Sequence, residues 1–241
     1  LQHGVPQPHV QFLLHHVLEE VSRRNYLTEV LYLKEDDDWE HLSSKHGPFS
    51  DRVKGIISLN PFPVEDSPFL AEDRIPLVFV GPRGRLSYPS VTGNNWHGGY
   101  RLTSQVIQKG HKEIILCSNK GSVDYSTGRF IEGHKAALSE HGLAFNQEAL
   151  EFSNQFHHQD LIGYKKYFEK FRAATAVIAL NDVVAQSLVS VADLLEIQIP
   201  RDLSLVCSGT TPMHKEHDTR QITSIEYYVH TVVSTGMDIL E

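Results

Sequence analysis

The sequence predicts an α/β protein in which parallel strands are wound into sheets with helices on both faces. Short apolar runs without polar alternation, such as Ile114 to Cys117, indicate strands covered on both sides. Stretches with apolar residues at helical spacing separate these runs along the chain. About nine or ten strands is a high number for one open sheet, so the pattern favours two doubly wound sheets of about five strands each.

The first third of the chain begins with an amphipathic helix. Val10, Leu14, Val17 and Val21 share one helical face and predict a helix that ends near Arg23-Arg24. Apolar runs then predict strands at 28–33, 55–59 and 76–80 and a short strand at 90–92, with helical turns within 35–47 and 67–74 and a loop at 81–89.

Longer helices follow in the rest of the chain. Leu102 and Val106 lie four residues apart on one helical face, and Gly110 stands where a left-handed C-terminal cap is expected. The remaining pattern predicts strands at 114–117, 149–153, 176–180 and 203–207, helices around 130–141, 159–171 and 184–195, and a last strand and helix within 221–240.

Composition and charge limit the classes of function. The chain has 241 residues, and 22 Lys and Arg stand against 30 Asp and Glu, a formal charge of -8 that disfavours a phosphate-binding surface. Cys117 and Cys207 lie within apolar strand patterns, which indicates buried, reduced thiols and a cytoplasmic protein. No apolar run reaches the roughly 18 residues of a membrane span, and no basic stretch precedes the first apolar residues. We expect no membrane association.

Catalytic and cofactor signatures are missing from the sequence. It contains no phosphate-binding G-x-x-x-x-G-K-[ST], no G-x-G-x-x-G after a strand and no G-x-S-x-G, so we expect no catalytic residues and no cofactor. Among 15 histidines, the best candidate metal cluster is His214, Glu216, His217 and Asp218, which is read more simply as a solvated polar loop. The neighbouring His15 and His16 point to different sides of a helix and are not expected to chelate a metal.

Several short motifs then resemble one family in their order and spacing. They are Asn94-Asn95, Gly98-Gly99, Gly110-His111, Arg129, Gly133, Asn181-Asp182 and the run "IPRDLSLV" from Ile199 to Val206. Together they resemble the effector-binding core of the LacI/GalR (lactose and galactose repressor) family of transcription regulators. The chain departs from that family at Gly81 and at Gly209-Thr210, where the family often has Asp, and in the register of Arg129 relative to Gly133.

The resemblance implies a fold and an organisation. The fold would be that of type I periplasmic-binding proteins, with two doubly wound parallel-sheet subdomains around a ligand cleft. Residues 1–97 plus 223–241 would form the N-terminal subdomain and residues 98–222 the C-terminal one, with crossovers near 93–98 and 221–226. The resemblance further implies a homodimer that senses a small-molecule effector and reaches operator DNA only through an N-terminal helix-turn-helix absent from this sequence.

The candidate ligand-binding residues are Gln7, Asn60, Asn95, Arg129, Phe156, Asn181 and Thr210. An Asn side chain both donates and accepts hydrogen bonds, which suits a hydroxylated ligand such as a sugar or nucleoside, although each Asn can equally serve as a turn or cap residue. Arg83 and Arg129, with the two missing acids, favour an anionic effector such as a sugar phosphate. The alternatives are that Arg129 pairs with Glu132 or Asp124 on the surface, or that the pocket senses another neutral ligand.

Two other functional classes stay open at this level. A periplasmic solute-binding protein would share the fold and would need an export signal. An enzyme on a wound sheet would need an activated nucleophile or a phosphate loop, and the sequence shows neither.

Overall fold

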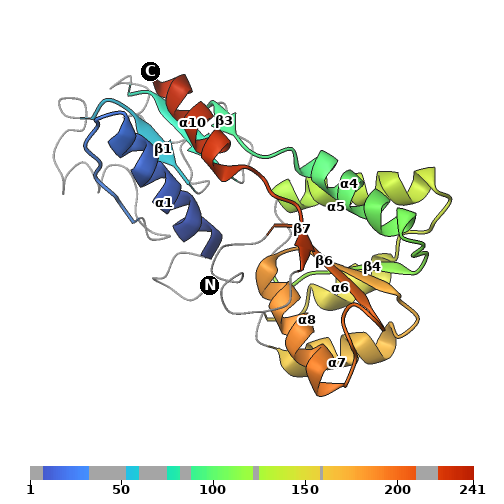
Figure 1. The fold of residues 1–241 in the computed structure, drawn as a ribbon. Helices are drawn as coiled ribbons and strands as arrows, with labels where there is room; N and C mark the ends of the chain where they lie inside the picture. The colour runs from blue at the N-terminus through green and yellow to red at the C-terminus, as the bar shows by residue number, and fades with distance from the viewer. Residues whose placement is uncertain are drawn as a thin grey trace. The chain divides into compact units, whose positions relative to one another are not determined.

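The computed structural model describes residues 8–32, 53–59, 75–81, 88–121, 125–157, 160–209 and 222–241. The chain divides into two compact units (Figure 1). The first unit comprises Leu1–Gly93 and Tyr228–Glu241, and the second comprises Asn94–Tyr227. Each unit contains a parallel sheet with helices packed on it, so the predicted fold class of two parallel-sheet α/β subdomains is confirmed.

The first unit is built on a three-stranded parallel sheet. Its strands β1 (Ile56–Ser58), β2 (Leu77–Val80) and β3 (Ser90–Val91) lie in that order. Helices α1 (Pro8–Arg23) and α10 (Val229–Leu240) lie side by side (Figure 1). Their apolar residues form one core with β2: Leu13, Val17 and Val21 of α1, Val78 and Val80 of β2, and Val233 and Met237 of α10.

An ion-pair network joins the ends of α1 and α10. Arg24 donates hydrogen bonds to Glu20 at 2.8 Å, to Asp238 at 2.6 Å and to Glu241 at 2.8 Å. The Glu20 carboxylate is buried, and its hydrogen bond from Arg23 is the largest cause that lowers its pKa to about 2. Because this carboxylate stays ionised and paired, it contributes stability above pH 4.5 that is lost as the pH falls toward 2.

The second unit is built on a four-stranded parallel sheet with both faces covered. Strands β4 (Ile114–Cys117), β5 (Ala176–Ala179), β6 (Ser204–Cys207) and β7 (Thr223–Ser224) follow one another in that order. Alternate residues of each strand face opposite sides, and β4 and β5 are buried along their whole length. This confirms the prediction from the uninterrupted apolar runs.

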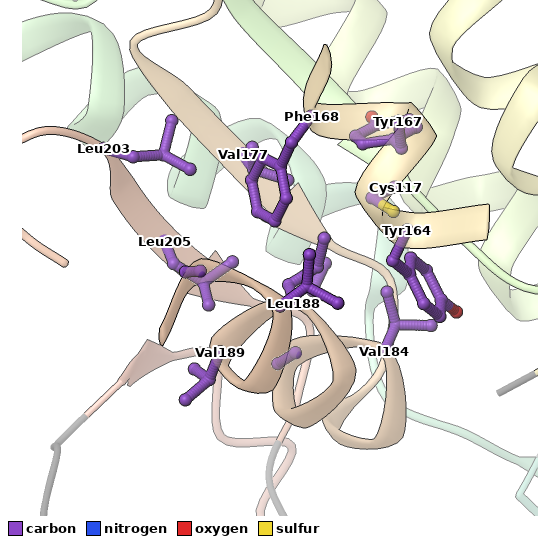
Figure 2. Packing of buried hydrophobic residues seen from close by; sticks show 14 of the residues in the cluster. Cys117, Tyr164, Tyr167, Phe168, Val177, Val184, Leu188, Val189, Leu203 and Leu205 are labelled. Carbon is purple, nitrogen blue, oxygen red and sulfur yellow. The ribbon is translucent and has the colours of Figure 1, made fainter. Parts of the chain in front are cut away.

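Different helices cover the two faces. Helices α4 (Asn95–Gln108) and α5 (Tyr125–Glu140) cover one face, where Leu102 and Phe130 pack with Leu116 and Ile178. Helices α7 (Leu161–Lys170) and α8 (Asp182–Leu194) cover the other. Figure 2 shows this second core, in which Tyr164, Tyr167 and Phe168 of α7 and Val184, Leu188 and Val189 of α8 surround Val177, Leu203, Leu205 and Cys117. Cys117 and Cys207 are buried, free thiols.

Two predicted strands are wrong. Residues 28–32, the described part of the strand predicted at 28–33, are assigned to no strand because they pair with none of the strands in the described ranges. The strand predicted at 149–153 is instead the helix α6 (Gln147–Ser153), because the Asn146 side chain caps its start by accepting from the Ala149 amide at 2.9 Å. Over the described residues the sheets therefore have three and four strands rather than about five each.

Other predictions about local structure are confirmed or lie outside the described residues. Gly110 has φ +97°, as expected for a left-handed residue after the end of α4. Gly142 has φ +67° just after α5. The helical turns predicted within 35–47 and 67–74 lie outside the described residues, as does most of the loop at 81–89.

Candidate functional site

The register of the four-stranded sheet brings the ends of its strands to one edge. Cys117 pairs with Ala179, Ala179 with Cys207, and Cys207 with Ser224. Residues that follow the strands therefore lie along the same side of the sheet, which is where wound α/β sheets bind ligands. We call this side the carboxyl edge and define it by Ser118, Asn119, Asn181, Asp182, Ser208 and Tyr227.

An amide pair occupies the end of the carboxyl edge at β4 and β5. Asn181, which follows β5, donates from Nδ2 to the Asn119 Oδ1, which follows β4, at 3.0 Å. The Asn181 Oδ1 also accepts from the Val184 amide at 2.9 Å, so this side chain caps α8 as well. Both amides are thus fixed by hydrogen bonds between neighbouring strand ends, and the positive end of the α8 dipole lies beside them.

The end of β4 is held by polar residues of α6. The Ser118 amide donates to the Ser153 Oγ at 3.0 Å, and the Ser118 hydroxyl donates to the Asn154 Oδ1. Ser118 and Ser153 are fully buried. These contacts satisfy the polar groups at the end of β4 and fix the backbone that leads into Asn119.

A pair of hydroxyls occupies the other end of the carboxyl edge. The Ser208 Oγ, after β6, lies 3.0 Å from the Tyr227 hydroxyl oxygen, after β7. Burial is the largest cause that raises the pKa of Tyr227 to about 12, and the hydrogen bond with Ser208 opposes it. The phenol is therefore neutral at physiological pH and offers a hydrogen-bond donor.

The helix starts near this sheet carry the other polar candidates. Asn94 caps α4 by accepting from the His97 amide at 3.1 Å, and Asn95 is the first residue of α4. Arg129, in the first part of α5, donates to the Glu132 carboxylate, and both side chains are about half exposed. From the sequence, this surface ion pair was one alternative to a contact between Arg129 and the ligand.

Four of the candidate ligand-binding residues are described by the structure, and each lies in a different place. Asn181 lies at the carboxyl edge, Asn95 at the start of α4, and Arg129 in its ion pair on α5. The Phe156 ring is buried in the core of the second unit, where it packs against Phe152 and Tyr164 with ring centroids 5.3 Å apart in each pair. Gln7, Asn60 and Thr210 lie outside the described residues.

Sequence reasoning missed Asn119, Ser208 and Tyr227. Asn119 and Ser208 follow apolar strands within two residues, so their position in the sequence was a usable signal. Tyr227 follows a strand of two residues, Thr223–Ser224, which is too short to mark its end reliably.

The chemistry of this edge is that of hydrogen bonding. Its amides and hydroxyls both donate and accept, which suits a ligand with several hydroxyl groups. Within the described ranges, no group of three or more His, Cys, Asp or Glu residues is arranged to hold a metal ion, and His214, Glu216, His217 and Asp218 lie outside those ranges. No helix in the described part of the chain is long and apolar enough to cross a membrane.

Comparison with known proteins gives a family match over more than half of the chain. Residues 103–241 match the family described as periplasmic binding protein-like domain. Among curated proteins, the chain is 26% identical to the HTH-type transcriptional repressor PurR of Haemophilus influenzae over 211 residues, which is 83% of this chain and 59% of that protein. The matches to the first curated relatives cover between 34% and 59% of the relatives' own length.

Solved structures support the same fold. A LacI family transcriptional regulator from Enterococcus faecium with bound ribose superposes with a TM-score of 0.78 at 21% identity, over 98% of this chain and 87% of that one. The transcription regulator CcpA of Lactococcus lactis gives a TM-score of 0.75 at 21% identity with the same coverage. At this level of identity the superpositions establish the fold.

Proposed function

Because the chain belongs to the periplasmic binding protein-like domain family and its relatives there are LacI-type transcription regulators, we propose that it is the effector-sensing and dimerising part of such a regulator. A small polar effector would bind at the carboxyl edge of the second unit and modulate the DNA binding of the regulator. The relatives found are regulators rather than enzymes, and they do not favour a periplasmic solute-binding protein. We propose no catalytic role and a cytoplasmic location.

The observation that supports effector binding best is the amide pair at the carboxyl edge. Asn119 and Asn181 come from different strand ends and are held 3.0 Å apart. Each amide group has both donor and acceptor capacity, so the pair can hydrogen-bond neighbouring hydroxyls of one ligand. Preorganised polar groups of this kind lose little conformational freedom on binding, which favours affinity.

The pairing of Arg129 bears on whether the effector is an anion or a neutral molecule. Arg83 and Arg129, with the two missing acids, were the basis for an anionic effector. Arg83 lies outside the described residues, and the Arg129 guanidinium is paired with Glu132. A ligand anion would have to compete with that carboxylate, while a neutral polyol would not. We therefore propose a neutral, hydroxylated effector, in the class of the ribose held by the Enterococcus faecium neighbour.

The test uses a substitution that separates ligand binding from helix capping. Asn181→Asp keeps an oxygen to cap α8 by accepting from the Val184 amide, but it removes the Nδ2 donor. We expect at least a roughly tenfold loss of affinity, the cost of about one hydrogen bond to a ligand, with little change in thermal stability. Calorimetry with D-ribose, other neutral sugars, their phosphates and nucleosides measures it.

The matched control is Asn146→Asp, which makes the same change at the N-cap of α6. This control should bind the wild-type ligand with unchanged affinity. The proposal fails if the wild-type chain binds none of these compounds, or if the two variants lose affinity equally. Tighter binding of a sugar phosphate than of its parent sugar would restore the anionic alternative.

The proposed partners follow from the family and the charge. We propose a homodimer, to be checked by sedimentation at tens of micromolar, where a monomer would contradict it. With a formal charge of -8, the chain alone should not bind operator DNA tightly, and salt-sensitive nanomolar binding would overturn that view.

A further inference from the structure

Tyr227 is fixed in the second unit by three surfaces. Its hydroxyl oxygen lies 3.0 Å from the Ser208 Oγ. A Cβ built on Gly98 would lie 3.2 Å from the Tyr227 hydroxyl oxygen, and one built on Gly209 would lie 3.5 Å from the ring. The ring therefore fits between two residues without side chains, at the start of α4 and after β6. The hydroxyl pair and this steric fit together hold Tyr227, which is the last residue of the second unit.

The next residue has an unusual backbone. Tyr228 has φ 46° and ψ 57°, in the left-handed region that L-residues with a Cβ adopt at a cost. It is the N-cap of α10 and makes no side-chain capping hydrogen bond. Its carbonyl oxygen accepts from the Thr231 amide at 2.9 Å and the Val232 amide at 3.2 Å. The side chain is mostly exposed, so its own packing offers little to offset the strain.

The boundary between the two units falls between these residues. We propose that they form a latch and a pivot: Tyr227 latches the chain to the second unit through Ser208, and the strained Tyr228 backbone is the point at which the chain turns as it enters the first unit. The left-handed conformation is maintained because Tyr227 is held on one side and the first turn of α10 on the other. Strain persists only where surrounding structure enforces it. This device does not depend on the proposed effector.

The latch is tested by two variants, each of which removes one of the two hydroxyl groups that form it. Tyr227→Phe keeps the ring between Gly98 and Gly209 and deletes the hydroxyl, and Ser208→Ala deletes its partner. Hydrogen exchange by mass spectrometry should show about fivefold faster exchange of residues 225–232 in both variants, as expected for the loss of one hydrogen bond. Tyr100→Phe is the matched control, because it deletes a hydroxyl bonded to Glu140 in the same unit.

Exchange of residues 225–232 at the wild-type rate in Tyr227→Phe would overturn the latch. So would an equal acceleration of α7 and α8, because that would show a general loss of stability. In the Tyr100→Phe control, exchange of residues 225–232 should stay at the wild-type rate, and faster exchange there would also count against a specific latch.

The pivot is tested by a pair of variants that both remove the Tyr228 ring. Tyr228→Asn introduces a residue that adopts the left-handed region readily, while Tyr228→Ser introduces one that adopts it at a cost. We expect residues 228–232 to exchange about threefold more slowly in the Asn variant than in the Ser variant. At an ordinary helix start the two variants should exchange alike, because Asn and Ser are equally good N-cap residues. Faster or equal exchange in the Asn variant would therefore overturn the pivot.

Discussion

Replacing Gly133 by alanine should lower the free energy of unfolding of the second unit by about 3 kcal/mol or more. A Cβ at this position would lie 1.9 Å from the Trp96 carbonyl oxygen and 2.9 Å from the Tyr100 amide nitrogen. Both are backbone atoms of α4, so no side chain can rotate away, and α4 and α5 would have to separate. The reciprocal contact is as close, since a Cβ on Gly99 would lie 2.0 Å from the Phe130 carbonyl oxygen.

Gly128→Ala is the matched control, in the same helix. A Cβ there has no atom within 4 Å, and alanine is the better helix former, so we expect a gain of up to about 1 kcal/mol. Urea unfolding followed by far-ultraviolet circular dichroism measures both variants, and hydrogen exchange of α4 and α5 assigns the effect to the second unit. Equal and small effects of the two substitutions would show that α4 and α5 do not pack at this distance.

The strands of the second unit could be predicted because each is a short, continuous apolar run. Ile114 to Cys117 and Ala176 to Ala179 are buried on both faces, and that burial is what removes polar alternation from the sequence. Thr28 to Tyr32 shows the limit of the same reasoning. β-rich composition indicates that a segment can be a strand, but pairing depends on a partner elsewhere in the chain.

The parts of the candidate site that could be predicted are those in which a residue contacts others close to it in the sequence. Asn181 follows a clear strand and caps the next helix, so its place at the carboxyl edge could be expected. The Ser208–Tyr227 pair joins residues 19 apart, and most of the residues between them lie outside the described ranges. The glycine contacts between α4 and α5 likewise depend on how two helices cross, which hydrophobic periodicity does not specify. His134 is a similar case, because it lies within the helix predicted around 130–141 but its partner Thr103 comes from another helix.

His134 is fully buried between α4 and α5 in a defined tautomer. The Thr103 hydroxyl donates to the Gly99 carbonyl oxygen at 2.7 Å, so its oxygen accepts from the His134 Nδ1 at 2.8 Å. The proton is therefore on Nδ1, and Nε2 is a buried acceptor without a hydrogen-bond partner in the described structure. Burial, and to a lesser extent the charge of Lys135, lowers the pKa of His134 to about 3. A proton added at Nε2 would place an unpaired charge in the core.

The second unit should consequently lose stability in mild acid. Below pH 6.5 the unfolded chain binds a proton at His134 that the folded chain does not bind until about pH 3, so the free energy of unfolding falls across this range, by about 3 kcal/mol at pH 4. His134→Leu removes the titrating group, and its stability curve from pH 7 to pH 4 should be flatter than that of the wild type by this amount. Parallel curves for the wild type and His134→Leu in urea titrations at each pH would mean that His134 is protonated in the folded protein and that the α4–α5 interface admits its charge.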